Sequence, residues 1–286
     1  MAPPPVEQGH RPLAHFLQVR AHPGPVDNEG AIRGCLAPGG RLLTPSSHPD
    51  PTGGAGPARL EHVGITDFSL EWFSLAGRTA VVTGGNSGLG QAFSLALATA
   101  GADVCVPTLL GDGGETRALV EATGRRYVEL TIDLTRDGAA EEVVATCAAE
   151  LGGPDVLVNS AGLNRVAPWQ EFGREHWEPM VEVNLTAPFA MARAAAPGMV
   201  DRGRGKIINV ASVFSFLGGR TSPAYAATKH GLVGFTKAYA DELGGHGVQV
   251  NAIAPGYVAT ALTASTRADP VAERAVRERT PAGRWG

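Results

Sequence analysis

The chain has 286 residues, of which 43% are hydrophobic and 18% charged, proportions that are ordinary for a globular protein. Its formal net charge of −4 and its lack of any run of Lys or Arg argue against a nucleic-acid partner. Cys35, Cys105 and Cys147 show no C-x-x-C spacing, so neither a disulfide framework nor a metal site is indicated. No apolar stretch reaches the roughly 20 residues of a membrane span, and no export signal is evident. We therefore expect a cytoplasmic protein without a membrane anchor.

The first 62 residues differ in composition from the rest of the chain. They hold eleven of the 21 prolines together with glycine pairs, and no helical or alternating apolar period runs through them. Such a segment buries too little apolar surface to offset its ordering entropy. We interpret residues 1–62 as a disordered Pro/Gly-rich leader, with a regulatory arm as the alternative. A start of translation near Val63 is a further hypothesis.

From Arg78 onward, short β-branched runs alternate with stretches of helical length. Helices are predicted at segments such as 91–100 and 139–151. The predicted strands lie at 79–83, 103–107, 126–132, 156–159, 206–211 and 248–253. The continuous apolar run Ala80-Val81-Val82 fits a strand that is covered on both faces. Residues 63–286 therefore predict one α/β domain with a parallel sheet between two layers of helices.

The first predicted strand leads into a glycine-rich turn and then a helix. Glycine lets the backbone turn tightly, approach a pyrophosphate and pack the helix on the strand, while the helix N-terminus attracts the anion. The strand–turn–helix context favours a dinucleotide site over a purely structural turn. The residues of the turn expected to bind the cofactor are Gly84, Asn86, Ser87, Gly88, Leu89 and Gly90.

Five further motifs follow in chain order. They are Val158-Asn159-Ser160-Ala161-Gly162, Val183-Asn184, Ser212, Tyr225-Ala226-Ala227-Thr228-Lys229 and Asn251-Ala252-Ile253-Ala254-Pro255-Gly256. Together with the spacing Thr-Gly-x-x-x-Gly-x-Gly of the turn, the series resembles the short-chain dehydrogenase/reductase family over about two hundred residues. Ser160 departs from the family pattern, which has Asn there. The resemblance implies a doubly wound, three-layer Rossmann-type fold and an NAD(P)-dependent oxidoreductase acting on CH-OH groups.

The spacing of Tyr225 and Lys229 has a chemical reason. Hydride transfer at a carbon that bears oxygen requires a proton to leave or reach that oxygen, and a tyrosine with a pKa of about 10 is a poor base at neutral pH. Four residues apart, the two side chains share a helix face, and the ammonium favours the phenolate. The resemblance implies that Lys229 also bonds the nicotinamide ribose, that Ser212 holds the substrate oxygen and that Asn184 anchors a proton-relaying water. Each residue alone also fits a structural role.

The resemblance implies further cofactor contacts. The residues concerned are Asp133, Leu134, Asn159, Ala161, Gly162, Tyr225, Lys229, Pro255, Gly256, Val258 and Thr260. Asp133 would accept a hydrogen bond from the exocyclic amine of adenine. The second strand exits through Val106-Pro107-Thr108 without the acid typical of NAD enzymes, and Ser87 supplies no cation for the extra phosphate of NADP. We expect NAD rather than NADP.

Several less general stretches resemble one branch of the family, the 2-deoxy-D-gluconate 3-dehydrogenases, also described as 2-dehydro-3-deoxy-D-gluconate 5-dehydrogenases. They include Ser215-Phe216-Leu217-Gly218-Gly219 and the closing Pro281-Ala282-Gly283-Arg284-Trp285-Gly286. The branch implies hydride transfer between NAD and a secondary alcohol or ketone of a sugar acid, with Arg165 and Arg220 as candidates for the carboxylate. The alternatives are gluconate 5-dehydrogenase, a 3-oxoacyl thioester reductase, or a dinucleotide-binding protein without turnover.

The hexapeptide 281–286 closes the sequence where relatives continue with a helix, a last parallel strand and a tail. We therefore expect the last edge strand of the sheet to be missing and the strand at 248–253 to form an uncovered edge. For such a truncated chain we expect lower stability, weak activity and poor assembly of the homotetramer that relatives form.

Overall fold

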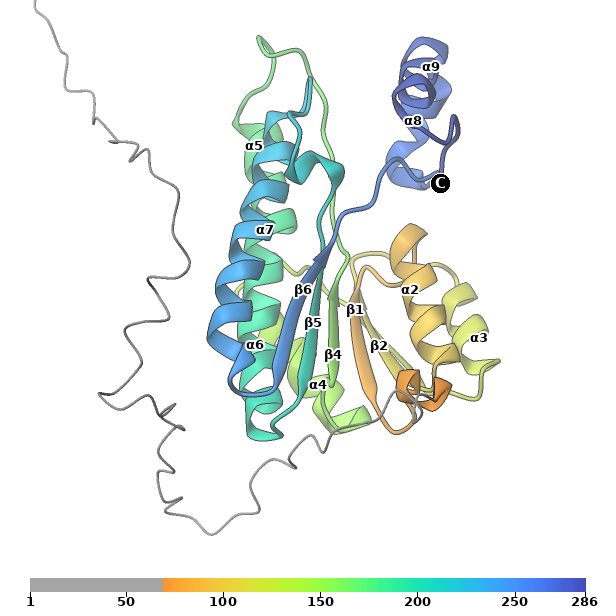
Figure 1. The fold of residues 1–286 in the computed structure, drawn as a ribbon, viewed down its shortest axis with the longest axis vertical. Helices are drawn as coiled ribbons and strands as arrows, with labels where there is room; N and C mark the ends of the chain where they lie inside the picture. Colours follow the sequence, from red (N-terminus) through yellow and green to blue (C-terminus); the bar gives the residue numbers. More distant parts are fainter. Residues whose placement is uncertain (1–68) are drawn as a thin grey trace, which may run out of the picture. The chain divides into compact units, whose positions relative to one another are not determined.

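The computed structural model describes residues 69–286, whose arrangement is shown in Figure 1. The leader predicted at residues 1–62, the domain boundary at residue 63 and Cys35 lie outside the described residues. Six parallel strands form one sheet in the order β3-β2-β1-β4-β5-β6. The chain winds outward in both directions from the neighbouring strands β1 and β4, so the predicted doubly wound α/β fold is confirmed.

The strands lie where the β-branched runs predict them. Their bounds are β1 (Thr79–Thr83), β2 (Asp103–Thr108), β3 (Tyr127–Thr131), β4 (Val156–Asn159), β5 (Gly205–Val210) and β6 (Val248–Ile253). The central strands β1 and β4 are buried at every position, because helices cover both of their faces.

Helices of varied length connect the strands and follow the last one. Their bounds are α2 (Gly88–Thr99), α3 (Glu115–Glu121), α4 (Ala139–Leu151), α5 (Arg174–Val181), α6 (Ala187–Asp201), α7 (Pro223–Gly244), α8 (Ala264–Ala268) and α9 (Pro270–Arg279). The helix α4 has the predicted bounds, whereas α2 begins at Gly88 rather than at residue 91. Gly88 and Gly90 have low helix propensity, so the local sequence alone places the start too late.

Two apolar cores fill the space between the three layers. On one face of the sheet, Val81 and Leu157 pack with Val143 of α4 and Met191 of α6. On the other face, alternate residues of the same strands pack against α2 and α3. Alternation of side chains along each strand therefore builds both cores from one sheet.

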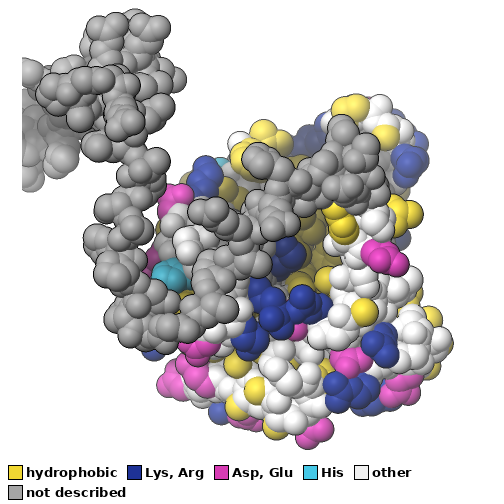
Figure 2. Space-filling view, turned by 60° about the horizontal axis from the view of Figure 1, so that its bottom comes forward, with side chains coloured by type: hydrophobic (Ala, Val, Ile, Leu, Met, Phe, Trp, Pro, Cys, Tyr) yellow, Lys and Arg dark blue, Asp and Glu magenta, His cyan; other side chains and the backbone are white. Residues whose placement is uncertain are grey.

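Charged side chains link the amino ends of the strands. Asp155, just before β4, accepts a hydrogen bond from the backbone N–H of Thr79 at 3.1 Å. Three guanidinium groups surround its carboxylate, those of Arg78, Arg202 and Arg204, with N···O distances of 3.7, 3.9 and 3.3 Å. Figure 2 shows Lys and Arg side chains grouped near the centre of the face it brings forward, with Asp and Glu side chains around them. The ion pairs of Asp155 connect β1, β4 and β5 at one end of the sheet.

The opposite, carboxyl ends of the strands lead into the loops that carry the motifs. After β6 the chain continues into α8 and α9, at the upper right of Figure 1. Among the described residues β6 pairs only with β5, and the exposed fraction of Ile253 is 39%. The expected uncovered edge at 248–253 is therefore present. Within residues 69–286, no helix is both long and apolar enough to cross a membrane.

Candidate active site

Hydrogen bonds tie the motif-bearing loops together at the carboxyl ends of the strands. The hydroxyl of Thr83, at the end of β1, accepts from the backbone N–H groups of Ser160 and Ala161 after β4, both at 3.0 Å. The N–H of Val213, after β5, donates to the carbonyl of Pro255, after β6, at 3.1 Å. Ligands of doubly wound sheets bind where the strand order reverses, which here lies between β1 and β4.

Close backbone contacts explain the glycines of the turn after β1. A Cβ atom on Gly90 would lie 2.2 Å from the carbonyl oxygen of Gly84, so a larger residue would push α2 away from the turn. Gly84 has a φ of +61°, and a Cβ atom there would lie 3.2 Å from Cα of Ala161. The predicted reasons for these glycines, a tight turn and close helix packing, therefore hold.

The N-terminus of α2 is open to an anionic ligand. Ser87 occupies the N-cap position in an extended conformation, and its side chain makes no capping hydrogen bond. The first turn of α2 contains no acidic residue, and Ser87 and Gly88 are exposed. The first N–H groups of a helix point outward and carry partial positive charge. The glycine turn and this helix end therefore fit a dinucleotide pyrophosphate.

The side chain of Asn86 organises the neighbouring loop after β2. Its Nδ2 donates to the carbonyl of Leu110 at 2.7 Å, and its Oδ1 accepts from the hydroxyl of Thr108 at 2.8 Å. The residue is buried. Asn86 therefore fixes the exit of β2, where the adenosine ribose of a dinucleotide would lie.

Asp133 and Leu134 follow β3, at the carboxyl ends of the strands. The carboxylate of Asp133 accepts from both the N–H and the hydroxyl of Thr135, at 2.9 and 2.7 Å, and these bonds lower its pKa. The side chain is exposed, whereas Leu134 packs against the core. Asp133 thus presents an ionised, oriented carboxylate.

Asn159 directs its side chain into the sheet. Its Nδ2 donates to Oδ1 of Asn209 at 2.8 Å, and Asn209 in turn donates to Thr236 of α7 at 2.9 Å. The side chain of Asn159 is buried, and its Oδ1 has no hydrogen-bond partner among the described residues. Ala161 and Gly162 follow Asn159 in the same motif. Ala161 lies close to Gly84 of the glycine turn, and Gly162 lies close to Lys229.

Three of the four predicted catalytic side chains meet at the start of α7. The Nζ atom of Lys229 lies 5.6 Å from the ring centroid of Tyr225 and donates to the carbonyl of Val210 at 2.7 Å. Burial raises the pKa of Tyr225, and the neighbouring hydroxyl of Ser212 opposes this shift. Burial also lowers the pKa of Lys229 to about 8.

The fourth predicted catalytic residue, Asn184, holds the loop that follows β4. It lies in a π-helical turn, Glu182–Thr186, between α5 and α6. Its amide accepts from the N–H of Leu163 at 2.9 Å and donates to the carbonyl of Leu163 at 2.8 Å. A Cβ atom on Gly162 would lie 3.3 Å from Oδ1 of Asn184 and 3.9 Å from Nζ of Lys229. Asn184 therefore belongs to the same cluster as Lys229.

The two candidate substrate arginines lie on loops that contact each other. The N–H of Ala167 donates to the carbonyl of Thr221 at 3.0 Å, and the hydroxyl of Ser222 donates to the carbonyl of Arg165 at 2.9 Å. Arg165 is exposed, and its Nη1 donates to the carbonyl of Glu175 at 2.6 Å. Arg220 is also exposed. The structure thus brings the two loops together, with both guanidinium groups accessible.

The loop after β6 contacts the glycine turn and the cluster of predicted catalytic residues. A Cβ atom on Gly88 would lie 3.3 Å from Cγ2 of Thr260. Sequence reasoning missed two rings in this region, Phe214 and Tyr257. Phe214 packs edge to face on Tyr225 at 6.0 Å and on Tyr257 at 6.1 Å. The sequence signal for them is their position: Phe214 lies two residues after Ser212, and Tyr257 directly follows Pro255-Gly256.

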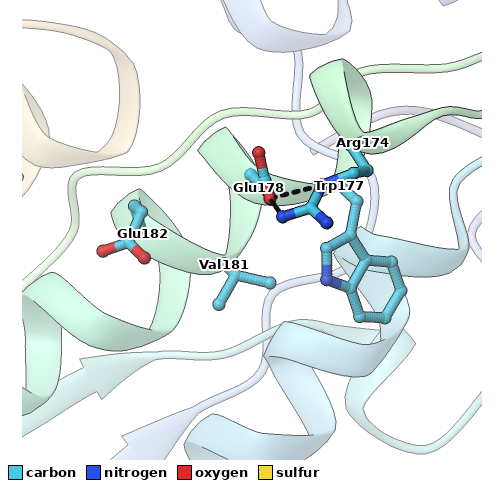
Figure 3. Close-up of a pocket in the computed structure, with 5 residues that line it drawn as sticks. All are labelled: Arg174, Trp177, Glu178, Val181 and Glu182. Carbon is cyan, nitrogen blue, oxygen red and sulfur yellow. Dashed lines mark hydrogen bonds and ion pairs between the residues drawn. The ribbon is translucent and has the colours of Figure 1, made fainter.

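Two surface hollows lie outside this cluster. One hollow of about 340 Å³ lies beside α5, lined by Arg174, Trp177, Glu178, Val181 and Glu182 (Figure 3). In that view Arg174 is paired with Glu178, and the indole of Trp177 lies on the other side of the guanidinium. A second hollow, of about 290 Å³, lies between α7 and the edge strand β6. Neither hollow includes Asn184, Ser212, Tyr225 or Lys229.

Known proteins are similar to most of this chain. The short chain dehydrogenase family profile matches residues 78–271. The uncharacterized oxidoreductase YgcW of Escherichia coli is 50% identical over 222 residues, which cover 78% of this chain and 85% of that protein. The 2-dehydro-3-deoxy-D-gluconate 5-dehydrogenase of Bacillus subtilis is 43% identical, over 75% and 84% of the two chains.

The fold comparison agrees with the sequence comparison. A candidate NAD(P)-dependent gluconate 5-dehydrogenase of Beutenbergia cavernae, solved with NADP bound at low occupancy, superposes with a TM-score of 0.71. It is 43% identical, and the match covers 75% of this chain and 86% of that one. With the glycine turn, the Tyr-x-x-x-Lys pair and the family match in agreement, the chain belongs to the short-chain dehydrogenase family.

Proposed function

We propose that this chain transfers a hydride between NAD and a secondary alcohol or ketone of a sugar acid. The observation that carries the proposal is the cluster of Ser212, Tyr225 and Lys229 beside the glycine turn. The relative from Bacillus subtilis is named for a reaction of this class, at 43% identity. When bound, the nicotinamide supplies the hydride acceptor or donor.

The protein's own side chains would manage the proton. Tyr225 is the general acid or base for the substrate oxygen, and the hydroxyl of Ser212, next to the phenol, orients that oxygen. Burial raises the pKa of Tyr225, so the phenol favours its protonated form, which suits proton donation to a ketone. Below a pH of about 8, Lys229 is charged and opposes this effect by stabilising the phenolate. Asn184 keeps the loop of Gly162 and Leu163 in place beside the lysine.

The cofactor would lie across the glycine turn and the loops after β2 and β3. We propose NAD rather than NADP, because Thr108, Leu109 and Leu110 at the exit of β2 offer no cation to a 2′-phosphate. The relative from Beutenbergia cavernae was solved with NADP, so the two cofactors need direct comparison. The ratio of kcat/KM for NAD to that for NADP should exceed one. A ratio below one would reverse this assignment.

The substrate carboxylate would bind a guanidinium on the joined loops after β4 and β5. Arg165 and Arg220 are the two candidates, and a carboxylate prefers the bidentate donors of arginine. Replacing the residue that binds the carboxylate by Ala should raise KM for a sugar acid far more than KM for a neutral polyol of the same length. Equal changes in both KM values would remove that arginine from the role.

The decisive experiment is turnover across a panel of sugar acids, followed by the Tyr225→Phe variant. We expect NADH formation from at least one hydroxy sugar acid and a loss of kcat of about 10²-fold or more in the variant, because the proton donor is gone. NADH binding, measured by fluorescence, should persist. Binding without turnover on every acid would instead indicate a dinucleotide-binding protein.

Gluconate 5-dehydrogenase activity is the second candidate, because the relative from Beutenbergia cavernae carries that assignment. A direct comparison of gluconate with 2-deoxygluconate and 2-dehydro-3-deoxygluconate separates the two reactions. We also propose a cytoplasmic location, which fractionation of the host cells tests.

A further inference from the structure

Four aromatic rings form a continuous chain that ends on the proposed proton donor. The ring centroids of Tyr225 and Phe214 are 6.0 Å apart with an interplanar angle of 81°. Phe214 and Tyr257 are 6.1 Å apart at 89°, and Tyr257 and Trp285 are 5.8 Å apart at 77°. Each pair therefore packs edge to face, the arrangement that the ring quadrupoles favour.

Backbone hydrogen bonds fix the far end of this ring chain. The N–H of Gly286 donates to the carbonyl of Tyr257 at 2.9 Å, and the N–H of Ala259 donates to the carbonyl of Gly286 at 3.1 Å. The pair of bonds joins the segment of Trp285 to the loop after β6. The indole of Trp285 is partly buried, and its N–H is shielded from solvent. Trp285 therefore has one defined position against Tyr257.

The near end of the ring chain reaches both groups that would act on the substrate oxygen. The N–H of Phe214 donates to the hydroxyl of Ser212 at 3.2 Å, and the same hydroxyl acts on the phenol of Tyr225 by lowering its pKa. Tyr225 lies in the first turn of α7, which begins at Pro223. The first turn of a helix leaves backbone N–H groups without partners inside the helix, and the contact with Phe214 restrains the ring of Tyr225 at this point.

We propose that Trp285 is a positioning residue for Tyr225, acting through Tyr257 and Phe214. This inference rests on the proposed function, in which the phenol exchanges a proton with the substrate. The rings fill the side of Tyr225 that faces the loop after β6, and they set the direction of its hydroxyl toward the substrate. Misplacement of a reacting group by about 1 Å can cost about 10²-fold in rate.

The kinetic test compares Trp285→Ala with Trp285→Phe. The Ala variant should lose kcat by about 10-fold to 100-fold while the dissociation constant for NADH changes less than about 2-fold. The Phe variant keeps a ring against Tyr257 and should recover most of the rate. Trp177→Ala is the matched control, since Trp177 lies on α5 outside the ring chain. An unchanged kcat in Trp285→Ala, or no recovery with Phe, overturns the proposal.

A second readout does not depend on turnover. The chain has four tyrosines, so ¹³Cζ labelling gives four resonances, and Tyr225→Phe identifies the one from Tyr225. Burial raises the pKa of this phenol, while the hydroxyl of Ser212 opposes the shift. Loss of the indole should admit water and move the titration midpoint toward the ordinary value of about 10. Trp285→Phe should keep the midpoint of the wild-type protein.

The two readouts separate the inference from the proposed function. If no sugar acid turns over but the midpoint of Tyr225 moves in Trp285→Ala, the proposed substrate class fails while the positioning role stands. If sugar acids turn over and the midpoint stays constant, the positioning role fails. Should Trp285→Ala not fold, Phe214→Leu removes the next ring but keeps an apolar side chain, and it should shift the same midpoint in the same direction.

Discussion

Lys229 combines deep burial with a position beside the proposed proton donor. Its Nζ atom donates to the carbonyl of Val210, and no carboxylate takes part in that bond. Burial without a charged partner favours the neutral amine, which lowers the pKa to about 8. The protonated side chain is thus held in place at a cost to stability.

This cost should be visible in the pH dependence of unfolding. Between pH of about 8 and the ordinary lysine pKa of about 10.4, the unfolded chain holds a proton at Lys229 that the folded chain has released. The free energy of unfolding should therefore rise with pH across this window, relative to Lys229→Met. Denaturant titrations of both proteins at several pH values measure the difference. Parallel curves for the two proteins would contradict the lowered pKa.

Asn184 allows a second prediction at the scale of one residue. Its amide satisfies both backbone groups of Leu163 in a fully buried position. Asn184→Ala leaves these groups unpaired, so the free energy of unfolding should fall by about 2–4 kcal/mol. Asn251→Ala, at an exposed asparagine of β6, should change it by less than about 0.5 kcal/mol. Denaturant unfolding measures both, and equal small changes would show that Asn184 is not a structural anchor.

The spacing of residues in the sequence predicted which residues form the cluster, but it did not predict where all of their side chains point. Tyr225 and Lys229 were found from their separation of four, because a helix fixes which residues share a face. Asn159 followed from its motif alone, and its side chain bonds Asn209 inside the sheet. A side chain at the end of a strand can point into the sheet or toward a loop. The choice depends on the neighbouring strand and helix, so a short motif does not predict it. The rings of Phe214 and Tyr257 were missed for the same reason.

At the scale of elements, the β-branched runs predicted the strands well and the irregular helical turn not at all. The π-helical turn Glu182–Thr186 precedes Pro188, which has no N–H to donate to the carbonyl of Asn184 in a regular α-helix. A wider turn at this point brings Asn184 beside Leu163. The proline is visible in the sequence, but the form of the irregularity depends on packing against α7.

Two glycines make a matched test of element packing. A Cβ atom on Gly90 would meet the carbonyl of Gly84 at 2.2 Å, whereas one on Gly234, in α7, would meet nothing within 4 Å. Gly90→Ala should lower the free energy of unfolding by about 1–3 kcal/mol and weaken NADH binding, because α2 must move off the turn. Gly234→Ala should raise it by about 0.5–1 kcal/mol through helix propensity. Destabilisation by both substitutions would contradict the close contact as the cause.

At the scale of the whole molecule, the two ends of the sheet carry different groups of residues. The amino ends are joined by the arginines around Asp155, and the carboxyl ends carry the proposed catalytic cluster. The lateral edges differ as well. Among the described residues, one edge of β6 has no paired strand and lies next to the hollow along α7, whereas the central strands are covered on both faces. Exposed hydrophobic strand edges pair readily with other chains.

A charge on this edge should therefore reduce self-association. Ile253 of β6 is 39% exposed, and Leu119 of α3 is 38% exposed, so Lys at either position adds the same charge at a similarly accessible site. At concentrations at which the wild-type protein self-associates, Ile253→Lys should form smaller species, because a charged edge opposes strand pairing. Light scattering over a concentration series measures this. Leu119→Lys should behave like the wild-type protein, and an equal effect of both substitutions would assign the change to net charge rather than to the β6 edge.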